Sequence, residues 1–199
     1  GSYPNQNHPK QGSSIKVEPI RDLKAIYRIK KLLEDKPRDY CLFTLGINSA
    51  YRANELLSIT VSQVDYLQSG DRFDLKQSKN SLYRAVTIND TVMRAIDAWL
   101  KLHPDPGPDA PLFPSQKGKE AITVQWLNSM VKEWCRNVGV RGNYGAHTLR
   151  KTFGFHQRKT FGQPLSLLVR AYGHSSEAQT LEYLCIQPEE MEELYAGAL

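Results

Sequence analysis

Apolar residues recur every three to four positions in several parts of the chain, the spacing that places side chains on one face of an α-helix. The pattern starts near residue 20, where lysines occupy the opposite face of the predicted helix. The same period predicts a helix over 89–103, capped by Asn89 or Asp90, and another from a Thr123 cap to Gly139. The first apolar stripe consists of Leu23, Ile26, Tyr27, Ile29, Leu32 and Leu33.

Shorter apolar segments predict further helices. Pro37 interrupts the first pattern, and the apolar run over 38–47 is typical of a short buried helix. Residues 51–59 continue in helical phase before a turn. After a glycine-containing turn, three or four short helices are expected, one opening at 147 and the others over 164–171, 176–184 and 188–199.

Two short runs of β-type residues flank a polar link in the middle of the chain. They cover 71–77 and 83–88, and residues 78–81 between them can serve as a hairpin turn. The alternation of strands and helices that builds a parallel sheet is absent. The sequence therefore predicts an α+β fold that is mainly α, a multi-helix domain with one small antiparallel hairpin or three-stranded sheet.

Composition is that of one globular domain with a tail. The chain has 199 residues, of which 40% are hydrophobic, enough for a real core. Residues 1–14 are polar, Gly1 and Ser2 resemble a cloning scar, and the domain is expected to cover 15–199. No apolar run approaches the ~20 residues that cross a bilayer, so no membrane contact is expected.

Charge and cysteine content indicate the class of partner and the redox compartment of the protein. Lys and Arg number 26 against 21 acidic residues, and this mild excess favours an anionic partner. Cys41, Cys135 and Cys185 are odd in number and lack metal-ligand spacing, which favours reduced thiols in a cytoplasmic protein.

His147 and Arg150 are three residues apart at the start of a predicted helix, so their side chains share one face, roughly 5–6 Å apart at Cβ. An imidazole and a guanidinium so placed can both point at one oxyanion, and Arg offers planar paired donors for phosphate oxygens. Taken alone, such a pair is more often a solvated basic face, which Lys151 would extend.

His174 precedes the helix that carries Tyr183. It lies between Gly173 and a Ser-Ser cap, at a helix amino end whose unpaired N–H groups favour an anion. Tyr183 follows nine residues later. A tyrosine here is usually a core or surface aromatic. Its phenol attacks at neutral pH only where cations stabilise its anion or a base removes its proton.

Arg52 and Lys79 are candidates in the first half of the chain. Arg52 and Glu55 are spaced as an intrahelical ion pair, or else Glu55 supports Arg52 as a second phosphate clamp. Lys79 falls in the hairpin turn, where composition favours a solvent-exposed lysine. A mobile ammonium at a hairpin tip could instead protonate a leaving oxygen.

The order of these residues resembles the tyrosine recombinase (phage integrase) family, whose members break and rejoin DNA. The family's set is an Arg, a hairpin Lys, His-x-x-Arg, a second His or Trp and a nucleophilic Tyr. The resemblance runs from about residue 15 to 199, and two departures stand out. Here "SAYR" replaces Thr-Gly-Leu-Arg, and "RAYGH" replaces the usual Leu-Leu-Gly-His. The matching residues are Arg52, Lys79, His147, Arg150, His174 and Tyr183.

The resemblance implies a site-specific recombinase or integrase that acts through a 3′-phosphotyrosyl intermediate. Tyr183 would attack the phosphodiester while both arginines neutralise the non-bridging oxygens. His147 would exchange the tyrosyl proton, His174 would donate to the phosphate, and Lys79 would protonate the departing 5′-oxygen. The resemblance implies that neither a metal nor another cofactor is needed.

The family also implies partners and a place in the cell. The expected partner is double-stranded DNA, with a homo-tetramer on synapsed duplexes, in the cytoplasm at the nucleoid. Lys151, Arg158 and Lys159 are expected to contact DNA phosphates. Most members carry a DNA-binding domain ahead of the catalytic one, so this chain is a fragment or a short member. The acidic helix over 188–199, with Met191, Leu194 and Tyr195 on one edge, packs on its own core or docks on a neighbour.

Three rival interpretations stay open. A metal-dependent nuclease would need clustered carboxylates, but Asp65, Asp71 and Asp74 are more typical of a solvated loop. A type IB topoisomerase would share the chemistry and relax one duplex as a monomer. A silent DNA-binding regulator would keep the fold without needing an aligned nucleophile. His8, His103 and His156 are interpreted as bystanders, with His156 facing the DNA groove or solvent.

Overall fold

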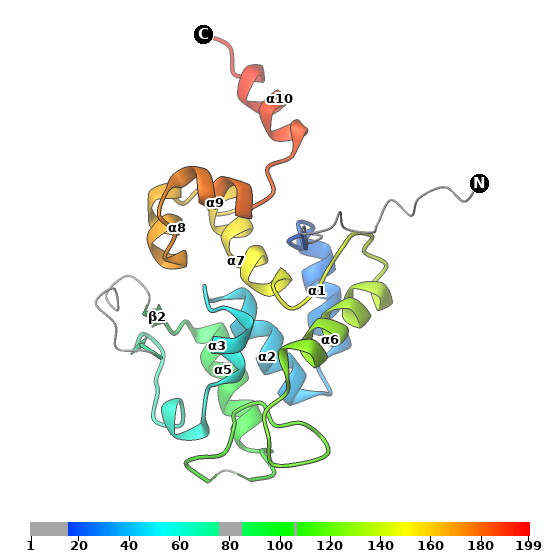
Figure 1. Ribbon diagram of the computed structural model, residues 1–199, viewed down its shortest axis with the longest axis vertical. Coiled ribbons are helices and arrows are strands. Elements are labelled where there is room, and N and C mark those ends of the chain that lie inside the picture. Colours follow the sequence, from blue (N-terminus) through cyan, green and yellow to red (C-terminus); the bar gives the residue numbers. More distant parts are fainter. Residues whose placement is uncertain (1–15, 76–84, 106) are drawn as a thin grey trace, which may run out of the picture.

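Helices form most of the chain that the structure describes, as the apolar periodicity predicts. The computed structural model describes residues 16–75, 85–105 and 107–199 (Figure 1). The helices are α1 (Leu23–Leu32), α2 (Pro37–Ile47), α3 (Ala53–Leu57), a 3-10 turn η1 (Val61–Gln63), α5 (Asp90–Leu100), α6 (Val124–Asn137), α7 (Thr148–Lys159), α8 (Leu165–Tyr172), α9 (Glu177–Tyr183) and α10 (Pro188–Ala196).

A short antiparallel pair of strands completes the fold. Strand β1 (Arg72–Phe73) pairs with β2 (Val86–Thr87), with Arg72 opposite Thr87 and Phe73 opposite Val86. The predicted α+β class, mainly α with a small antiparallel sheet, is therefore confirmed. The predicted hairpin turn with Lys79 lies outside the described residues.

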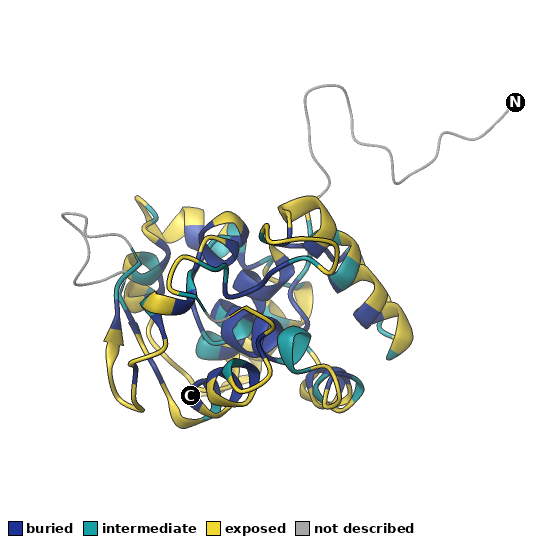
Figure 2. Ribbon diagram, turned by 90° about the horizontal axis from the view of Figure 1, so that it is seen from below, coloured by how far each residue is buried: buried dark blue, intermediate teal, exposed yellow. Residues whose placement is uncertain are grey.

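The main core is built around α2, which is buried over Cys41–Gly46. A helix that is apolar on all sides must be enclosed by neighbours. Helices α1, α5 and α7 pack against it. Figure 2 shows buried residues on the helix faces toward the middle of the molecule and exposed residues on the outer faces. This enclosure fixes the position of α7, the helix that carries His147-x-x-Arg150.

A second, smaller apolar cluster lies where α8 and α9 pack on each other and on α7. Figure 1 shows these two helices together beyond one end of α7. The cluster has fully buried members and partly buried neighbours, and it contains both Tyr172 and Tyr183. Its members are Ala50, Leu168, Tyr172 and Leu184, with Phe153, Leu165, Ala171 and Tyr183 packed against them.

Two local predictions are wrong. The helix expected to reach residue 59 ends at Leu57, because Ile59 accepts from the amide of Leu112 and Thr60 bridges to Pro111. The apolar stripe of α1 is also narrower than its sequence indicates. Tyr27 is 79% exposed, because only the Ile26–Ile29 side of the helix meets the core.

The three cysteines are free thiols in the structure, as their spacing in the sequence predicts. Cys41 and Cys135 are buried, and Cys185 is half-buried. Burial raises the pKa of Cys135 to about 12, so its thiol stays protonated. Across the described ranges, no helix combines the length and apolar character that spanning a bilayer requires.

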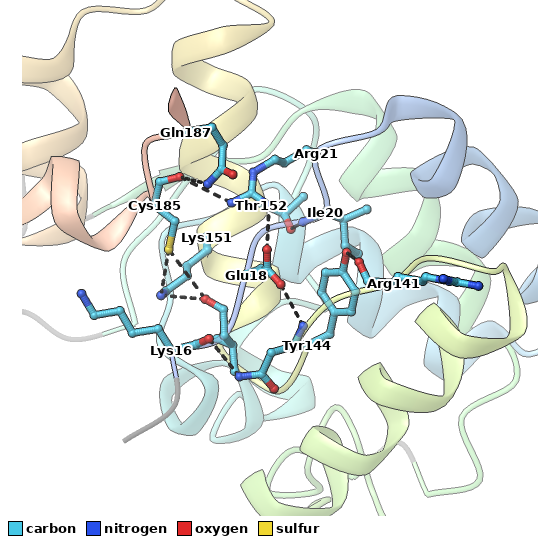
Figure 3. A network of polar contacts seen from close by, with 12 residues as sticks. Lys16, Glu18, Ile20, Arg21, Arg141, Tyr144, Lys151, Thr152, Cys185 and Gln187 are labelled. Atoms are coloured by element: carbon cyan, nitrogen blue, oxygen red, sulfur yellow. Dashed lines mark hydrogen bonds and ion pairs between the residues drawn. The ribbon is translucent and has the colours of Figure 1, made fainter. Parts of the chain in front are cut away.

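The segment before α1 is hydrogen-bonded to α7, which lies more than a hundred residues later in the chain (Figure 3). The amide of Ile20 donates to Thr152 Oγ1 at 2.9 Å, and Thr152 donates to the carbonyl of Thr148. His156 lies 2.8 Å through Nε2 from the carbonyl of Ile20 and 2.7 Å through Nδ1 from Thr160 Oγ1. The prediction that His156 faces the groove or solvent is therefore wrong, because this segment covers it.

We predict that Thr152→Val lowers the free energy of unfolding by about 1–3 kcal/mol, because the near-isosteric change leaves the buried amide of Ile20 without an acceptor. Thr44→Val is the matched control. Thr44 lies in α2, and its buried hydroxyl has no hydrogen-bond partner among the described residues, so its loss should not destabilise the protein. Urea unfolding followed by circular dichroism measures both variants. Equal losses would contradict the importance of the bond to Ile20.

Candidate active site

His147 and Arg150 occupy the first turn of α7. Gly145 donates its amide to Thr148 Oγ1, and Ala146 donates to Asn128 Oδ1, so the turn before the helix is fixed. His147 is the N-cap residue and is exposed, whereas Arg150 is buried. The predicted pair is thus present at the start of the helix, with the imidazole accessible and the guanidinium enclosed.

Arg150 connects three parts of the chain. Its Nε donates to the carbonyl of Ala50 at 2.8 Å, and Nη2 donates to the carbonyl of Tyr172 at 2.8 Å. The guanidinium carbon lies 4.7 Å from the centre of the Tyr172 ring and 5.2 Å from that of Tyr183. Burial lowers the pKa of Arg150, but a guanidinium remains charged at any working pH. The cation is therefore held against the candidate nucleophile.

Arg52 lies two residues after Ala50, whose carbonyl accepts from Arg150. It is the N-cap of α3, and its amide donates to Glu55 Oε1 at 2.9 Å. Arg52 Nη1 lies 3.6 Å from the same oxygen, and the Arg52 side chain is 42% exposed. Glu55 therefore supports Arg52 while leaving much of its guanidinium accessible.

Tyr51, which departs from the family pattern, is accommodated behind Arg52. Its ring packs edge-on against Phe73 with centres 6.0 Å apart, and its hydroxyl donates to the carbonyl of Phe73 at 3.2 Å. The residue is buried. The bulky side chain thus attaches the Arg52 loop to strand β1.

The charge of Arg52 reaches the other site residues. The pKa of His147 is lowered first by the partial loss of solvent around its otherwise accessible ring, and then by the nearby charges of Arg150, Lys151 and Arg52. Arg52 also favours the anionic form of Tyr183. Because Coulomb effects of this kind act over short distances, the two arginines influence one common region.

Tyr183 ends α9 with its ring among aromatic and cationic groups. The ring centre lies 5.2 Å from that of His174 and 4.8 Å from the ammonium of Lys151. Its hydroxyl is buried and makes no hydrogen bond of normal geometry among the described residues, but Arg150 is close enough to act on it through its charge and a side-chain contact. Burial raises the pKa of Tyr183, and Arg150 and Arg52 partly offset this effect. The phenol is therefore protonated at neutral pH.

His174 is held by the turn between α8 and α9. Gly173 adopts a left-handed conformation with φ of 71°, which ends α8, and Ser176 caps α9. His174 Nδ1 lies 2.8 Å from Thr180 Oγ1. This contact fixes the imidazole beside Tyr183, at the amino end of α9 as the sequence predicts.

Lys151, one of the three predicted DNA-phosphate contacts, has its ammonium bound within the protein. It is buried, and its ammonium donates to the carbonyl of Val17 at 2.9 Å and lies 3.8 Å from Cys185 Sγ (Figure 3). The segment before α1 covers this side of α7, as it covers His156. A pocket of about 280 Å³ opens there, lined by Lys16, Lys151, His174, Gln179, Glu182 and Tyr183.

Arg158 and Lys159, the other predicted phosphate contacts, are paired with α10. Arg158 Nη2 lies 2.9 Å from both carboxylate oxygens of Glu190, and Lys159 pairs with Glu193. Helix α10 extends away from the rest of the protein (Figure 1). Its predicted apolar edge is exposed at Met191, Leu194 and Tyr195, so the edge does not pack on its own core.

The remaining candidates are two histidines, Lys79 and the aspartates of the predicted loop. His103 is buried, with Nε2 2.9 Å from the carbonyl of Pro111, which fits its interpretation as a bystander. His8 and Lys79 lie outside the described residues. Asp65 and Asp71 are exposed, and in the part of the chain that the structure describes no three His, Cys, Asp or Glu residues could hold a metal ion.

Tyr172 is the site residue that the sequence analysis missed. It accepts from Arg150 through its carbonyl, and its ring lies against both His174 and Tyr183. The signal was available, because Tyr172 stands where the family usually has Leu before Gly-His. The sequence alone gives that departure no structural role.

The chain matches known proteins over most of its length. The model of the Phage integrase family matches residues 20–190. The probable integrase/recombinase YoeC of Bacillus subtilis is 33% identical over 172 residues, which cover 85% of this chain and 90% of YoeC. The tyrosine recombinase XerC of Caldanaerobacter subterraneus is 27% identical over 82% of this chain, which spans 47% of that protein.

Solved structures share the fold. The XerA recombinase has a TM-score of 0.73 at 21% identity, over 95% of this chain and 65% of that one. The XerH site-specific recombinase bound to palindromic difH substrate has a TM-score of 0.70 at 22% identity, over 92% of this chain and 54% of that one. The described residues thus correspond to part of these longer chains.

Proposed function

The chain belongs to the phage integrase family, and on this premise we propose that it breaks and rejoins DNA strands at specific sites, with Tyr183 as the nucleophile. The observation that carries the proposal is the contact of the buried Arg150 guanidinium with the Tyr183 ring, beside the buried Tyr183 hydroxyl. A phosphodiester bound there would accept from the remaining donors of the guanidinium and present its phosphorus to the phenolic oxygen. The relatives named as recombinases support the same class of reaction.

In the cleavage step, the phenolic oxygen of Tyr183 forms a bond to phosphorus and the bond from phosphorus to the 5′-oxygen breaks. The phenolic proton passes to His147, whose lowered pKa keeps it neutral and able to accept. The departing 5′-oxygen takes a proton, for which Lys79 remains the candidate from the sequence. The products are a 3′-phosphotyrosyl bond and a free 5′-hydroxyl.

Charge develops on the non-bridging oxygens as the new bond forms. Arg150 is held in place by two backbone carbonyls, so it can stabilise that charge without reorganising. Arg52 is more exposed and would complete the clamp, while His174 would donate to the same phosphate. Attack by the 5′-hydroxyl of another strand reverses the step, and the phosphotyrosyl bond conserves the energy for rejoining.

Double-stranded DNA is the proposed partner. The chain's net charge of +5 favours an anionic ligand, and solved relatives include XerH bound to difH substrate and a Tn1549 transposon integrase in complex with transposon right end DNA. We further propose that copies of the chain assemble on DNA through α10. Its exposed apolar edge is a surface that a neighbouring copy could cover.

The direct test is a search for the covalent adduct. The probe is a pool of nicked duplexes with randomised sequence on both sides of the nick, so that the short cleaved end dissociates and the adduct accumulates. Wild-type protein should give an adduct that survives a denaturing gel, with or without a chelator. Tyr183→Phe should abolish the adduct without weakening DNA binding. Tyr195→Phe is the matched control and should keep it.

Other outcomes would point to the rival functions. Equal adduct formation by Tyr183→Phe would refute the assigned nucleophile, and loss of cleavage in chelator would indicate a metal-dependent nuclease. DNA binding without any adduct in the wild type would indicate a silent regulator. Relaxation of one supercoiled duplex by a monomer, without synapsis, would indicate a topoisomerase.

The pH dependence of adduct formation should follow His147. Its pKa is lowered below the usual imidazole value, so the neutral base is present at pH 7 and is lost only as the pH falls through that lower value. At subsaturating DNA the rate should therefore be flat from about pH 7 down to about 6.5 and decline below it. His147→Gln should be slow and should lack this acid limb. An acid limb that persists in His147→Gln would assign the base to another group.

The ion pairs of α10 should compete with DNA for Arg158 and Lys159. Glu190→Gln with Glu193→Gln removes both partners, and Glu189→Gln with Glu192→Gln removes the same charge from exposed positions of the helix. We expect Glu190→Gln with Glu193→Gln to strengthen DNA binding more than the exposed double variant does. Its affinity should also fall more steeply with salt, by the amount that about one to two additional phosphate contacts produce. Fluorescence anisotropy across a salt series measures this. Identical slopes in the two double variants would show that these cations do not contact DNA.

A further inference from the structure

Tyr172, the last residue of α8, is the largest of the fully buried side chains. It is surrounded by the proposed catalytic groups. Its ring is stacked on His174 with centres 5.1 Å apart and an angle of 29° between the planes. It meets Tyr183 edge-on at 5.1 Å. One aromatic ring therefore contacts the imidazole, the phenol and, on the side of α7, the Arg150 guanidinium.

Tyr172 and Arg150 also exchange two hydrogen bonds. The hydroxyl of Tyr172 donates to the carbonyl of Arg150 at 2.7 Å, while Arg150 Nη2 donates to the carbonyl of Tyr172 at 2.8 Å. Burial raises the pKa of Tyr172 well above its usual value, so this phenol stays a donor at all working pH values. The end of α8 is thus locked to the helix that carries Arg150.

Gly154 makes room for this arrangement. It lies on α7 one turn after Arg150, and a Cβ atom there would lie 2.7 Å from Tyr172 Cζ and closer still to the hydroxyl oxygen. The same atom would lie 2.7 Å from Leu184 Cδ2, next to Tyr183. Atoms this close cannot coexist, so the bulk of Tyr172 depends on the missing side chain at 154. The two residues form an interlocked pair.

We propose that Tyr172 is a positioning residue for DNA cleavage, which holds Arg150 and His174 in their reactive orientations and limits the movement of the Tyr183 ring. This inference rests on the proposed function. Three reacting groups share one rigid support, so removing that support should reduce the rate of cleavage at bound DNA rather than the affinity for DNA. Small displacements of reacting groups lower rates strongly, whereas phosphate affinity is spread over many cations.

The experiment compares Tyr172→Leu and Tyr172→Phe with the wild type in single-turnover adduct formation on saturating nicked duplex selected from the randomised pool. Tyr172→Leu should slow cleavage by about tenfold to a hundredfold with DNA affinity within about twofold of wild type. Tyr172→Phe keeps the ring contacts and should retain most of the rate. Trp99→Leu is the control for a lost buried aromatic that donates to a carbonyl in the main core. Its folded fraction should cleave at the wild-type rate.

A double variant separates positioning from packing. Gly154→Ala alone should lower the melting temperature, because its methyl group collides with Tyr172. Combined with Tyr172→Leu, the methyl group fills part of the vacated space and the end of the flexible Leu184 side chain can shift away from it, so the melting temperature should recover most of the loss. Under the proposal, cleavage by this stable double variant stays slow. Cleavage at the wild-type rate by the double variant, or by Tyr172→Leu itself, would overturn it.

The two proposals fail in different ways. If the wild type forms no adduct with any nicked duplex, the proposed function is wrong and the inference falls with it. If the wild type forms the adduct and Tyr172→Leu matches its rate, only the positioning role is wrong. Slow cleavage accompanied by an equal loss of DNA affinity would also count against the positioning role.

Discussion

The site depends on the burial of one cation, Arg150. A guanidinium removed from water costs several kcal/mol unless its donors are satisfied, and here two backbone carbonyls and two aromatic faces provide partners. Those partners come from the loop before α3 and from the ends of α8 and α9. Satisfying Arg150 therefore brings together the segments that carry Arg52, His174 and Tyr183. The hydrogen bonds that offset the cost of burying Arg150 also bring the candidate site residues together.

The cluster of cations is unfavourable in the absence of an anion. Burial, and after it the neighbouring positive charges, lower the pKa of His147, while burial raises that of Tyr183 against the opposing effect of Arg150 and Arg52. The effect of charge on His147 is the one that cations without an anion produce. An anion bound there would relieve this repulsion and pair with the arginines, so the cluster favours binding of a phosphate. Lys151 adds a further positive charge against the face of the Tyr183 ring, where its ammonium is held by the carbonyl of Val17.

Local pattern predicted the parts of the fold that depend on neighbouring residues. Helices α1, α5 and α6 were expected within a few residues of their bounds, because their apolar period and capping residues are encoded in sequence. The end of α3 was misplaced because Thr60 pairs with Pro111, fifty residues away. His156 was expected to face the DNA groove or solvent, and Lys151 to contact DNA phosphates, because no local pattern shows what covers them. The segment that buries them lies far earlier in the chain.

The sequence by itself determined the family, the helical class of the fold and the order of candidate residues, because spacing along one helix and the chemistry of side chains are local properties. Only the tertiary structure decided which groups meet: that Arg150 stacks on Tyr172 and Tyr183, that Tyr51 packs behind Arg52, and that α10 pairs with Arg158 and Lys159. These contacts join residues distant in the chain. They follow from packing and from the need to satisfy buried polar groups, which no local period records.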